Sequence, residues 1–224
     1  MGEMNFVELG YRVGMQFVPF LFALCFHEFS HGLVAKIRGD NTAERLGRLS
    51  LNPIVHGDLL GTWILPLLAI VSNSGFMFGW AKPVPVDSRN LKTPLKDMFW
   101  IALAGPVSNF FLAFVSCFLL AFIITHGPEG SAGKALATLL INFIFVNITL
   151  AIFNLIPIHP LDGGKVIAPF LPIRWNIWLD HHQVQLSGAL FILIFLVGGI
   201  LAVPVNIIGQ GLLAFAQMIA VRIA

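Results

Sequence analysis

Long apolar segments, separated by short polar stretches, make up most of the chain. The five longest apolar runs cover about residues 13–37, 98–125, 135–156, 186–201 and 203–221. A bilayer core about 30 Å thick needs roughly 20 helical residues, so this pattern predicts about five to six transmembrane helices. A further run, residues 59–78, is interrupted by proline and glycine. We expect a re-entrant hairpin there instead of a single crossing.

The composition is that of a membrane protein. Of the 224 residues, 57% are hydrophobic and 11% are charged, whereas soluble domains carry about 25% charged residues. Because the apolar runs are continuous and do not alternate, they predict an all-α polytopic membrane protein and not a β-barrel. The predicted environment is therefore the lipid bilayer. A net charge of +2 is too small to suggest a nucleic-acid partner.

Basic residues gather in two polar loops. The first loop holds Lys36, Arg38, Arg45 and Arg48, and the second holds Lys82, Arg89, Lys92 and Lys96. By the positive-inside rule both loops face the cytoplasm, which requires that residues 59–78 do not cross the membrane once. We therefore expect the re-entrant hairpin or a short β segment near the cytoplasmic face. The N-terminus is then outside and the C-terminus inside, in a multi-pass protein of the cell (plasma or inner) membrane.

The first apolar run contains HEFSH at residues 27–31, an H-E-x-x-H pattern. On a helix, positions i and i+4 share a face, so His27 and His31 can bind one metal ion, and imidazole suits Zn²⁺. Glu28 can take a proton from metal-bound water. Such a pattern also arises by chance, but ionisable groups at membrane depth are costly and usually functional. If Lys36 marks the cytoplasmic interface, the histidines lie roughly 8 and 13 Å below it.

A catalytic zinc site usually has three protein ligands and one water. Asp162, in the stretch NLIPIHPLDGG, ends an apolar segment and is the best candidate for the third ligand. If residues 59–78 are re-entrant, run 98–125 leads outward and run 135–156 returns. Asp162 then reaches the face near which His31 lies. The alternative interpretation is a helix-end carboxylate that faces water.

Several further polar residues lie close to these motifs. Asn154 can hold the substrate backbone or stabilise an oxyanion, or it can form an interhelical hydrogen bond; the sequence leaves both open. His159 is a weaker ligand candidate because a proline separates it from Asp162. His56 and Asp58 can reach the site, but a solvated interfacial pair is the simpler interpretation.

Four stretches together resemble the site-2 protease family of intramembrane zinc metalloproteases. They are HEFSH, RLSLNPIVHGDLLGT with GWAKPVPV, ALAGPVSNF and NLIPIHPLDGG, in that order within residues 27–164. The resemblance implies one Zn²⁺ ion held by His27, His31 and Asp162. Compared with the six-helix core of the family, we expect the chain to start directly with the motif helix, without a counterpart of the preceding helix.

The same resemblance implies an intramembrane zinc metalloprotease with Glu28 as the base and Asn154 as a polar residue that contacts substrate. Its substrates would be transmembrane proteins or peptides whose helices partly unwind to expose a carbonyl. We also expect an exposed sheet edge from the RLGRLSLNP or the KPVPV stretch to bind the unwound strand. PDZ-type and CBS-type regions do not fit in the chain, which indicates the compact subgroup. We therefore expect residues 1–224 to form a single integral-membrane metalloprotease domain.

Two other functions are compatible with part of this pattern. A membrane metal transporter would also use intramembrane histidines and carboxylates, but it would need paired sites along a path. Here the ionisable residues converge on one depth. A catalytically silent zinc-binding membrane scaffold would not need Glu28, which is intact. A zinc assay combined with cleavage of a transmembrane substrate separates the three functions.

Overall fold

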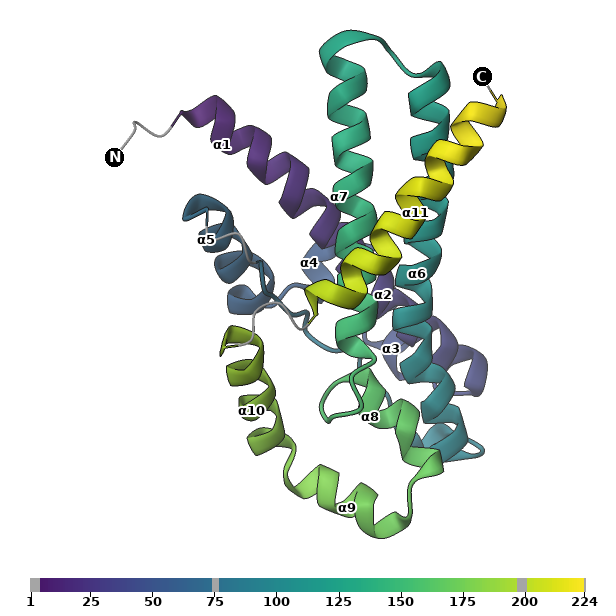
Figure 1. Cartoon of the computed structure of the whole chain (residues 1–224). Helices are drawn as coiled ribbons and strands as arrows, with labels where there is room; N and C mark the ends of the chain where they lie inside the picture. Colours follow the sequence, from purple (N-terminus) through teal and green to yellow (C-terminus); the bar gives the residue numbers. More distant parts are fainter. Residues whose placement is uncertain (1–4, 74–76, 197–200, 224) are drawn as a thin grey trace.

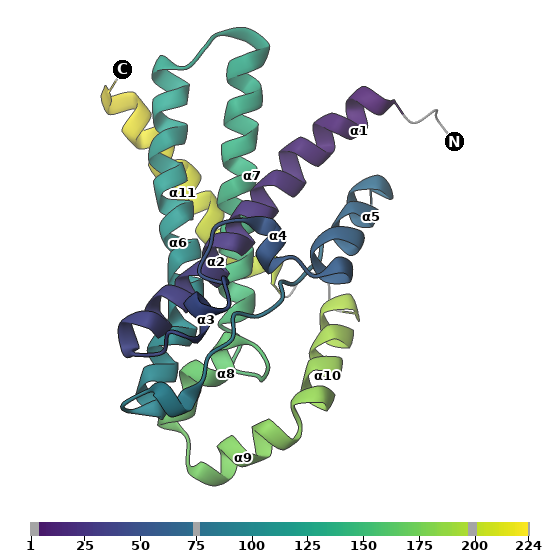
Figure 2. The same ribbon diagram turned by 180° about the vertical axis from the view of Figure 1, so that it is seen from behind.

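A computed structural model of the chain is shown in Figures 1 and 2. It describes residues 5–73, 77–196 and 201–223. The α-helices in chain order are α1 (Phe6–Arg12), α2 (Val18–Arg38), α3 (Thr42–Arg45), α4 (Pro53–His56), α5 (Leu65–Val71), α6 (Pro94–His126), α7 (Gly130–Asn154), α8 (Asp162–Ile167), α9 (Ile173–His181), α10 (Gln183–Leu196) and α11 (Ala202–Ile223). Short π-helical or 3-10 stretches are η1 (Val13–Phe17), η2 (Leu59–Ile64), η3 (Ser88–Asn90) and η4 (Ala168–Phe170). The predicted all-α membrane fold is confirmed.

The centre of the bundle is an antiparallel hairpin of α6 and α7, against which α2 and α11 pack (Figure 1). Helices α6, α7 and α11 share a core of small and branched side chains. Among its buried members are Ala113, Cys117, Ile144, Ile148 and Ala216. Lipid tails are as apolar as these side chains, so close packing through small residues is what stabilises helix association in a bilayer.

Four helical stretches in the described part of the chain are long and apolar enough to cross a membrane. They are Phe6–Arg38, which joins α1, η1 and α2, and then Pro94–His126, Gly130–Asn154 and Ala202–Arg222. The stretch Leu59–Val71 is apolar but shorter. Both the total of five to six spans and the re-entrant hairpin therefore remain predictions.

The β segment that we considered near the basic loops is reduced to one residue pair. Gly57 and Ala81 form an isolated antiparallel bridge, and no strand forms among the described residues. Prolines at 83 and 85 follow Ala81, and each lacks the N–H that a longer ladder needs. Residues 82–87 therefore form no ladder, and the two prolines favour extended backbone in this segment.

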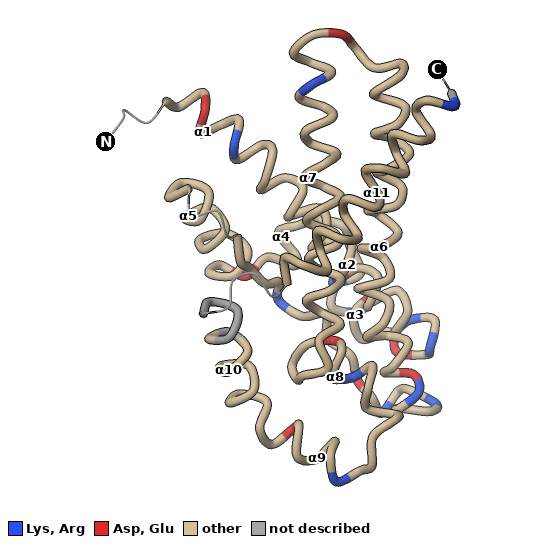
Figure 3. The backbone as a smooth tube through the Cα atoms, in the orientation of Figure 1, with Lys and Arg blue, Asp and Glu red and all other residues tan. Residues whose placement is uncertain are grey.

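Helices α10 and α11 run in the same direction, away from α9 (Figures 1 and 2). The C-terminus consequently lies toward the α6–α7 connection. Most Lys and Arg residues lie near the opposite end, around α3, the start of α6, α8 and α9 (Figure 3). The expectation that the C-terminus shares the basic side is wrong. A C-terminus on the basic side would require the apolar runs 186–201 and 203–221 to cross in opposite directions, whereas α10 and α11 do not reverse direction (Figure 1).

Candidate metal centre

Helix α2 carries two histidines on one buried face. It begins with Pro19 in its first turn and continues unbroken to Arg38, and Gly39, with a φ of 110°, ends it. The spacing of four residues places His27 and His31 one turn apart on the same face. Their side chains are almost fully buried, with relative exposures of 4% and 8%.

Asp162 approaches the same face from the C-terminal half of the chain. Helix α7 ends at Asn154, residues 155–161 turn back, and α8 starts at Asp162. A Cβ atom at Gly163 would clash with backbone carbonyl oxygens of this turn. Only glycine therefore fits directly after the aspartate, which explains the LDGG stretch.

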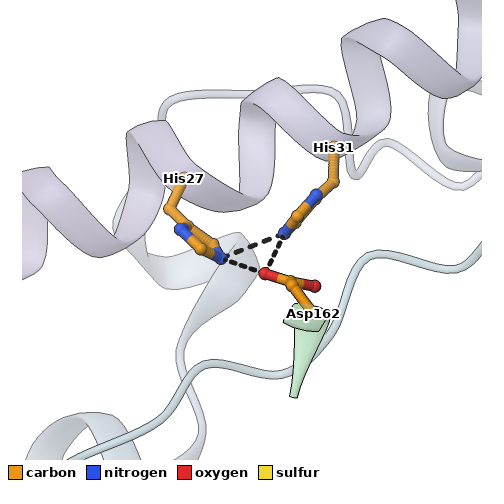
Figure 4. Close-up of side chains that lie close together, drawn as sticks. All are labelled: His27, His31 and Asp162. Carbon is orange, nitrogen blue, oxygen red and sulfur yellow. Dashed lines mark hydrogen bonds and ion pairs between the residues drawn. The ribbon is translucent and has the colours of Figure 1, made fainter. Parts of the chain in front are cut away.

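The three side chains point toward one another (Figure 4). Oδ2 of Asp162 lies 3.1 Å from Nε2 of His27 and 3.1 Å from Nε2 of His31. The two Nε2 atoms are 3.0 Å apart. The structure thus brings together the three residues that the sequence proposes as ligands.

The other ring nitrogen of each histidine is occupied by a hydrogen bond. Nδ1 of His31 lies 2.6 Å from the backbone carbonyl oxygen of Ile101. A carbonyl oxygen can only accept, so this nitrogen carries the proton. Nδ1 of His27 lies 2.6 Å from Oδ1 of Asn109, another acceptor. Because Nδ1 carries the proton in both rings, a neutral imidazole at either position has its lone pair on Nε2, the atom that faces the other histidine.

This arrangement fits a bound cation. The two Nε2 lone pairs and Oδ2 of Asp162 converge, and Oδ2 is buried without a hydrogen-bond donor. A cation among them satisfies all three atoms. Two imidazoles and one carboxylate suit zinc, and separations of 3.0–3.1 Å are close to the about 3.3 Å between tetrahedral zinc ligands. Among the described residues, this is the one group of His, Cys, Asp and Glu placed to hold a metal.

Glu28 lines the same cavity as the three converging residues. The cavity has a volume of about 900 Å³, and most of its lining is apolar. Oε2 of Glu28 accepts a hydrogen bond of 2.9 Å from the backbone N–H of Val84. Arg48, itself buried, donates to the carbonyl oxygens of Lys82 and Pro83. The extended segment at residues 82–87 is thereby held beside Glu28.

Gly105 allows α6 to approach the two histidines closely. A Cβ atom at this position would lie 2.5 Å from Cε1 and Nε2 of His31 and 2.6 Å from Cε1 of His27. Real Cβ contacts are essentially never shorter than 3.0 Å. The absence of a side chain at 105 is therefore part of the geometry of the centre.

The remaining sequence candidates lie apart from the converging side chains. Asn154 lines the cavity, but its Nδ2 donates within its own helix to the carbonyl oxygen of Leu150. His159 also lines the cavity, with Nδ1 3.6 Å from Oδ1 of Asp180. His56 is fully buried, and its Nε2 contacts the backbone oxygen of Ser50 at 2.6 Å. The expectation of a solvated His56 is therefore wrong.

The sequence did not single out Gly105, Asn109, Arg48 or Val84. Asn109 lies within the quoted stretch ALAGPVSNF, and a buried amide in an apolar helix was an available signal. No comparable signal marked Val84, because its role depends on a backbone N–H. In sequence, Arg48 is one of several basic loop residues expected at the cytoplasmic face, whereas in the structure its side chain is buried.

Comparison with known proteins agrees with this geometry. Residues 123–198, which include Asp162, match the sequence model of peptidase family M50. The chain is 40% identical over 159 residues to the "Putative zinc metalloprotease YwhC" of Bacillus subtilis, which covers 69% of this chain and 68% of YwhC. It is 30% identical over 152 residues to Rip2 of Mycolicibacterium smegmatis, named in the same way, covering 67% of this chain and 55% of Rip2.

A third relative is stage IV sporulation protein FB of Bacillus subtilis, which is 29% identical over 92 residues, or 41% of this chain and 28% of that protein. No solved structure matches the chain. On the extent of the similarity to YwhC and the family match, the chain belongs to peptidase family M50, the site-2 protease family. The resemblance found in the four sequence stretches is confirmed.

Proposed function

We propose that the protein is an intramembrane metalloprotease that uses one Zn²⁺ ion to hydrolyse peptide bonds in or near transmembrane segments. The observation that carries the proposal is the convergence of three lone-pair atoms, on His27, His31 and Asp162, in a buried cavity also lined by Glu28. Membership of a peptidase family supports hydrolysis as the reaction.

Each residue then has a distinct role. His27, His31 and Asp162 hold the metal, which when bound supplies Lewis-acid activation of water and of a peptide carbonyl. Glu28 accepts a proton from the attacking water and delivers it to the leaving amine. The hydrogen bond from Val84 to Oε2 restrains the rotamer of this carboxylate. Asn154, from the cavity wall, contacts the backbone of the substrate.

The substrate class follows from the surroundings of the site. The cavity walls are mostly apolar, with lining residues from α2, the segment near Val84, α7 and α10. The helix that carries His27 and His31 is long and apolar enough to cross a membrane. A transmembrane segment, partly unwound so that a carbonyl is free, fits such a site better than a soluble peptide. The lipid bilayer is the second partner.

Orientation is part of the proposal. The basic residues concentrate around α3, the start of α6, α8 and α9 (Figure 3), and this end is assigned to the cytoplasm by the positive-inside rule. The active site then lies near the cytoplasmic face of the cell membrane. A metal transporter is less well supported, because the described residues provide one metal-binding group and not a series.

The proposal is tested with the full chain purified in detergent. Bound zinc is measured by mass spectrometry, and cleavage is measured with a model transmembrane substrate. We expect about one zinc per chain, and cleavage that a chelator abolishes and added zinc restores. Asp162→Ala should lower zinc occupancy, whereas Glu129→Ala, at an exposed residue between α6 and α7, should not. A chain that binds no zinc, or cleavage that survives chelation, would overturn the proposal.

A further inference from the structure

Asn109 and Asn147 form a buried pair behind the metal centre. Both side chains are completely shielded from solvent. Nδ2 of Asn109 donates to Oδ1 of Asn147 at 2.8 Å and to the backbone oxygen of Ala23 at 3.1 Å. Nδ2 of Asn147 donates in turn to the backbone oxygen of Phe143 at 2.8 Å. The pair thus joins α6, α7 and α2.

These bonds decide which way the amide of Asn109 faces. A side-chain amide has two N–H donors and one oxygen. Both N–H groups of Asn109 donate, one to Asn147 and one to Ala23. Its Oδ1 is therefore left to face His27, 2.6 Å from Nδ1. The orientation of Asn147 is set independently, because the carbonyl oxygen of Phe143 can only accept.

We propose that Asn109 and Asn147 are positioning residues that set the metal affinity of the centre through His27. Oδ1 of Asn109 accepts a hydrogen bond from Nδ1–H of His27, which leaves the lone pair on Nε2 for the metal and restrains the ring. Asn147 acts one step further away by keeping the Asn109 oxygen turned toward the ring. This inference rests on the proposed function in one respect, namely that the centre binds zinc.

The two histidines differ in the group that accepts the hydrogen bond from Nδ1. His31 donates to the backbone oxygen of Ile101, which no side-chain substitution removes. The acceptor for His27 is the side chain of Asn109, so a substitution at position 109 can change the tautomer and the orientation of the His27 ring. Outer hydrogen bonds of this kind typically contribute 10–100-fold to metal affinity.

A purely structural interpretation is that the pair only joins three helices. The two interpretations predict different results in zinc titrations. If the pair only joins helices, its loss lowers thermal stability and leaves the intrinsic affinity of the folded protein for zinc unchanged. If the pair orients His27, the affinity itself falls, and it recovers when an acceptor oxygen is restored at position 109.

The experiment measures the zinc dissociation constant of the full chain in detergent by competition with a chromophoric chelator. Asn109→Leu removes the acceptor and leaves little room for a replacement water, so we expect binding about 10–100-fold weaker. Asn109→Asp keeps an acceptor oxygen and should bind zinc within a few-fold of the wild type. Asn142→Ala is the matched control, since it removes another interhelical bond of an α7 asparagine, to the Met15 backbone oxygen.

A double-mutant cycle tests whether Asn147 affects zinc binding only through Asn109. Asn147→Ala should weaken zinc binding by a smaller factor than Asn109→Leu. The double variant should be no weaker than Asn109→Leu alone, because Asn147 acts only through Asn109. If the losses in zinc affinity were additive, Asn147 would not act through Asn109. Wild-type zinc affinity in Asn147→Ala would also overturn this role of Asn147.

Failure of the two proposals can be told apart. A wild-type chain that binds no zinc overturns the proposed function together with this inference. A wild-type chain that binds zinc, with equal affinity in Asn109→Leu, overturns the inference alone. If Asn109→Leu does not fold, Asn147→Ala and Asn109→Asp decide the question. Unchanged zinc affinity in Asn147→Ala rejects the positioning role. A 10–100-fold loss of zinc affinity in Asn109→Asp rejects it as well.

Discussion

The backbone N–H of Val84 donates a 2.9 Å hydrogen bond to Oε2 of Glu28, although 56 residues separate them. This bond connects the extended segment at 82–87 to the motif on α2. A carboxylate with a fixed donor has fewer accessible rotamers, and a proton acceptor is effective only when it is held near the proton. The segment is therefore a structural support for the proposed base.

Replacement of Glu28 by glutamine should separate metal binding from catalysis. Glu28→Gln retains an oxygen that can accept from Val84, and it leaves the three proposed ligands untouched. It cannot accept a proton at neutral pH, so we expect cleavage to fall by about 10²–10⁴-fold with zinc content unchanged. Retained proteolysis would contradict the role of Glu28. Glu44→Gln, at an exposed residue paired with Lys36, is the control.

Arg48 should affect catalysis without affecting metal binding. Its guanidinium donates to the carbonyl oxygens of Lys82 and Pro83, next to the residue that contacts Glu28. Arg48→Met keeps an apolar stem but releases the segment, and small displacements near reacting groups can cost about 10²-fold in rate. We expect cleavage about 10–100-fold slower and normal zinc affinity. The exposed Arg45, changed to Met, should have no effect; equal losses in both variants would exclude this role for Arg48.

A methyl group at position 105 should disturb the metal centre directly. In Gly105→Ala the new Cβ would lie 2.5 Å from Nε2 of His31, so either α6 or the imidazole must move. We expect zinc affinity to fall about tenfold or more, as for other perturbations of ligand orientation. Gly211→Ala on α11, where a Cβ meets nothing within 4 Å, should bind zinc normally. Chelator competition compares the two, and wild-type affinity in Gly105→Ala would refute the close approach.

These residues show which parts of the site a sequence can predict. The shared face of His27 and His31 is a local property of the helix period, so the spacing alone predicts it. The approach of Asp162 followed from a count of membrane crossings. Asn109 could be suspected of a role as an amide in an apolar helix, but neither it nor Gly105 could be matched to the histidines, because the face of α6 that meets the imidazoles depends on how α2 and α6 cross. That crossing is a tertiary property.

For the fold, the sequence predicts the long helices but not the direction of every helix. Continuous apolar runs predicted the long helices, but they carry no information on direction where turn signals are weak. Pro204 lies in the first turn of α11, and α10 and α11 run in the same direction (Figure 1). A proline in the first turn of a helix is compatible with either path.

Asp40 should make the stability of the protein depend on pH in the acid range. It is fully buried just beyond α2 and accepts hydrogen bonds from Thr42, Asn90 and the backbone N–H of Asp87. Burial alone would raise the pKa of Asp40, but these hydrogen bonds outweigh it and lower the pKa below its ordinary value. The network ties the end of α2 to η3 and so supports the segment that leads to α6.

The sign of the pH effect follows from this direction. A carboxyl whose pKa is lower in the folded state stabilises the fold above its unfolded pKa, about 3.9, and that stabilisation disappears as the pH falls through the folded value. At pH 7, Asp40→Asn should cost about 2 kcal/mol, or about 4–8 °C in Tm. The gap in Tm between Asp40→Asn and wild type should be constant above about pH 4 and should narrow as the pH falls below it, toward the folded pKa of Asp40. Thermal melts between pH 3 and pH 7 measure this difference in Tm, with Glu129→Gln as the exposed control. A difference that does not change with pH would show that the charge of Asp40 does not support the network.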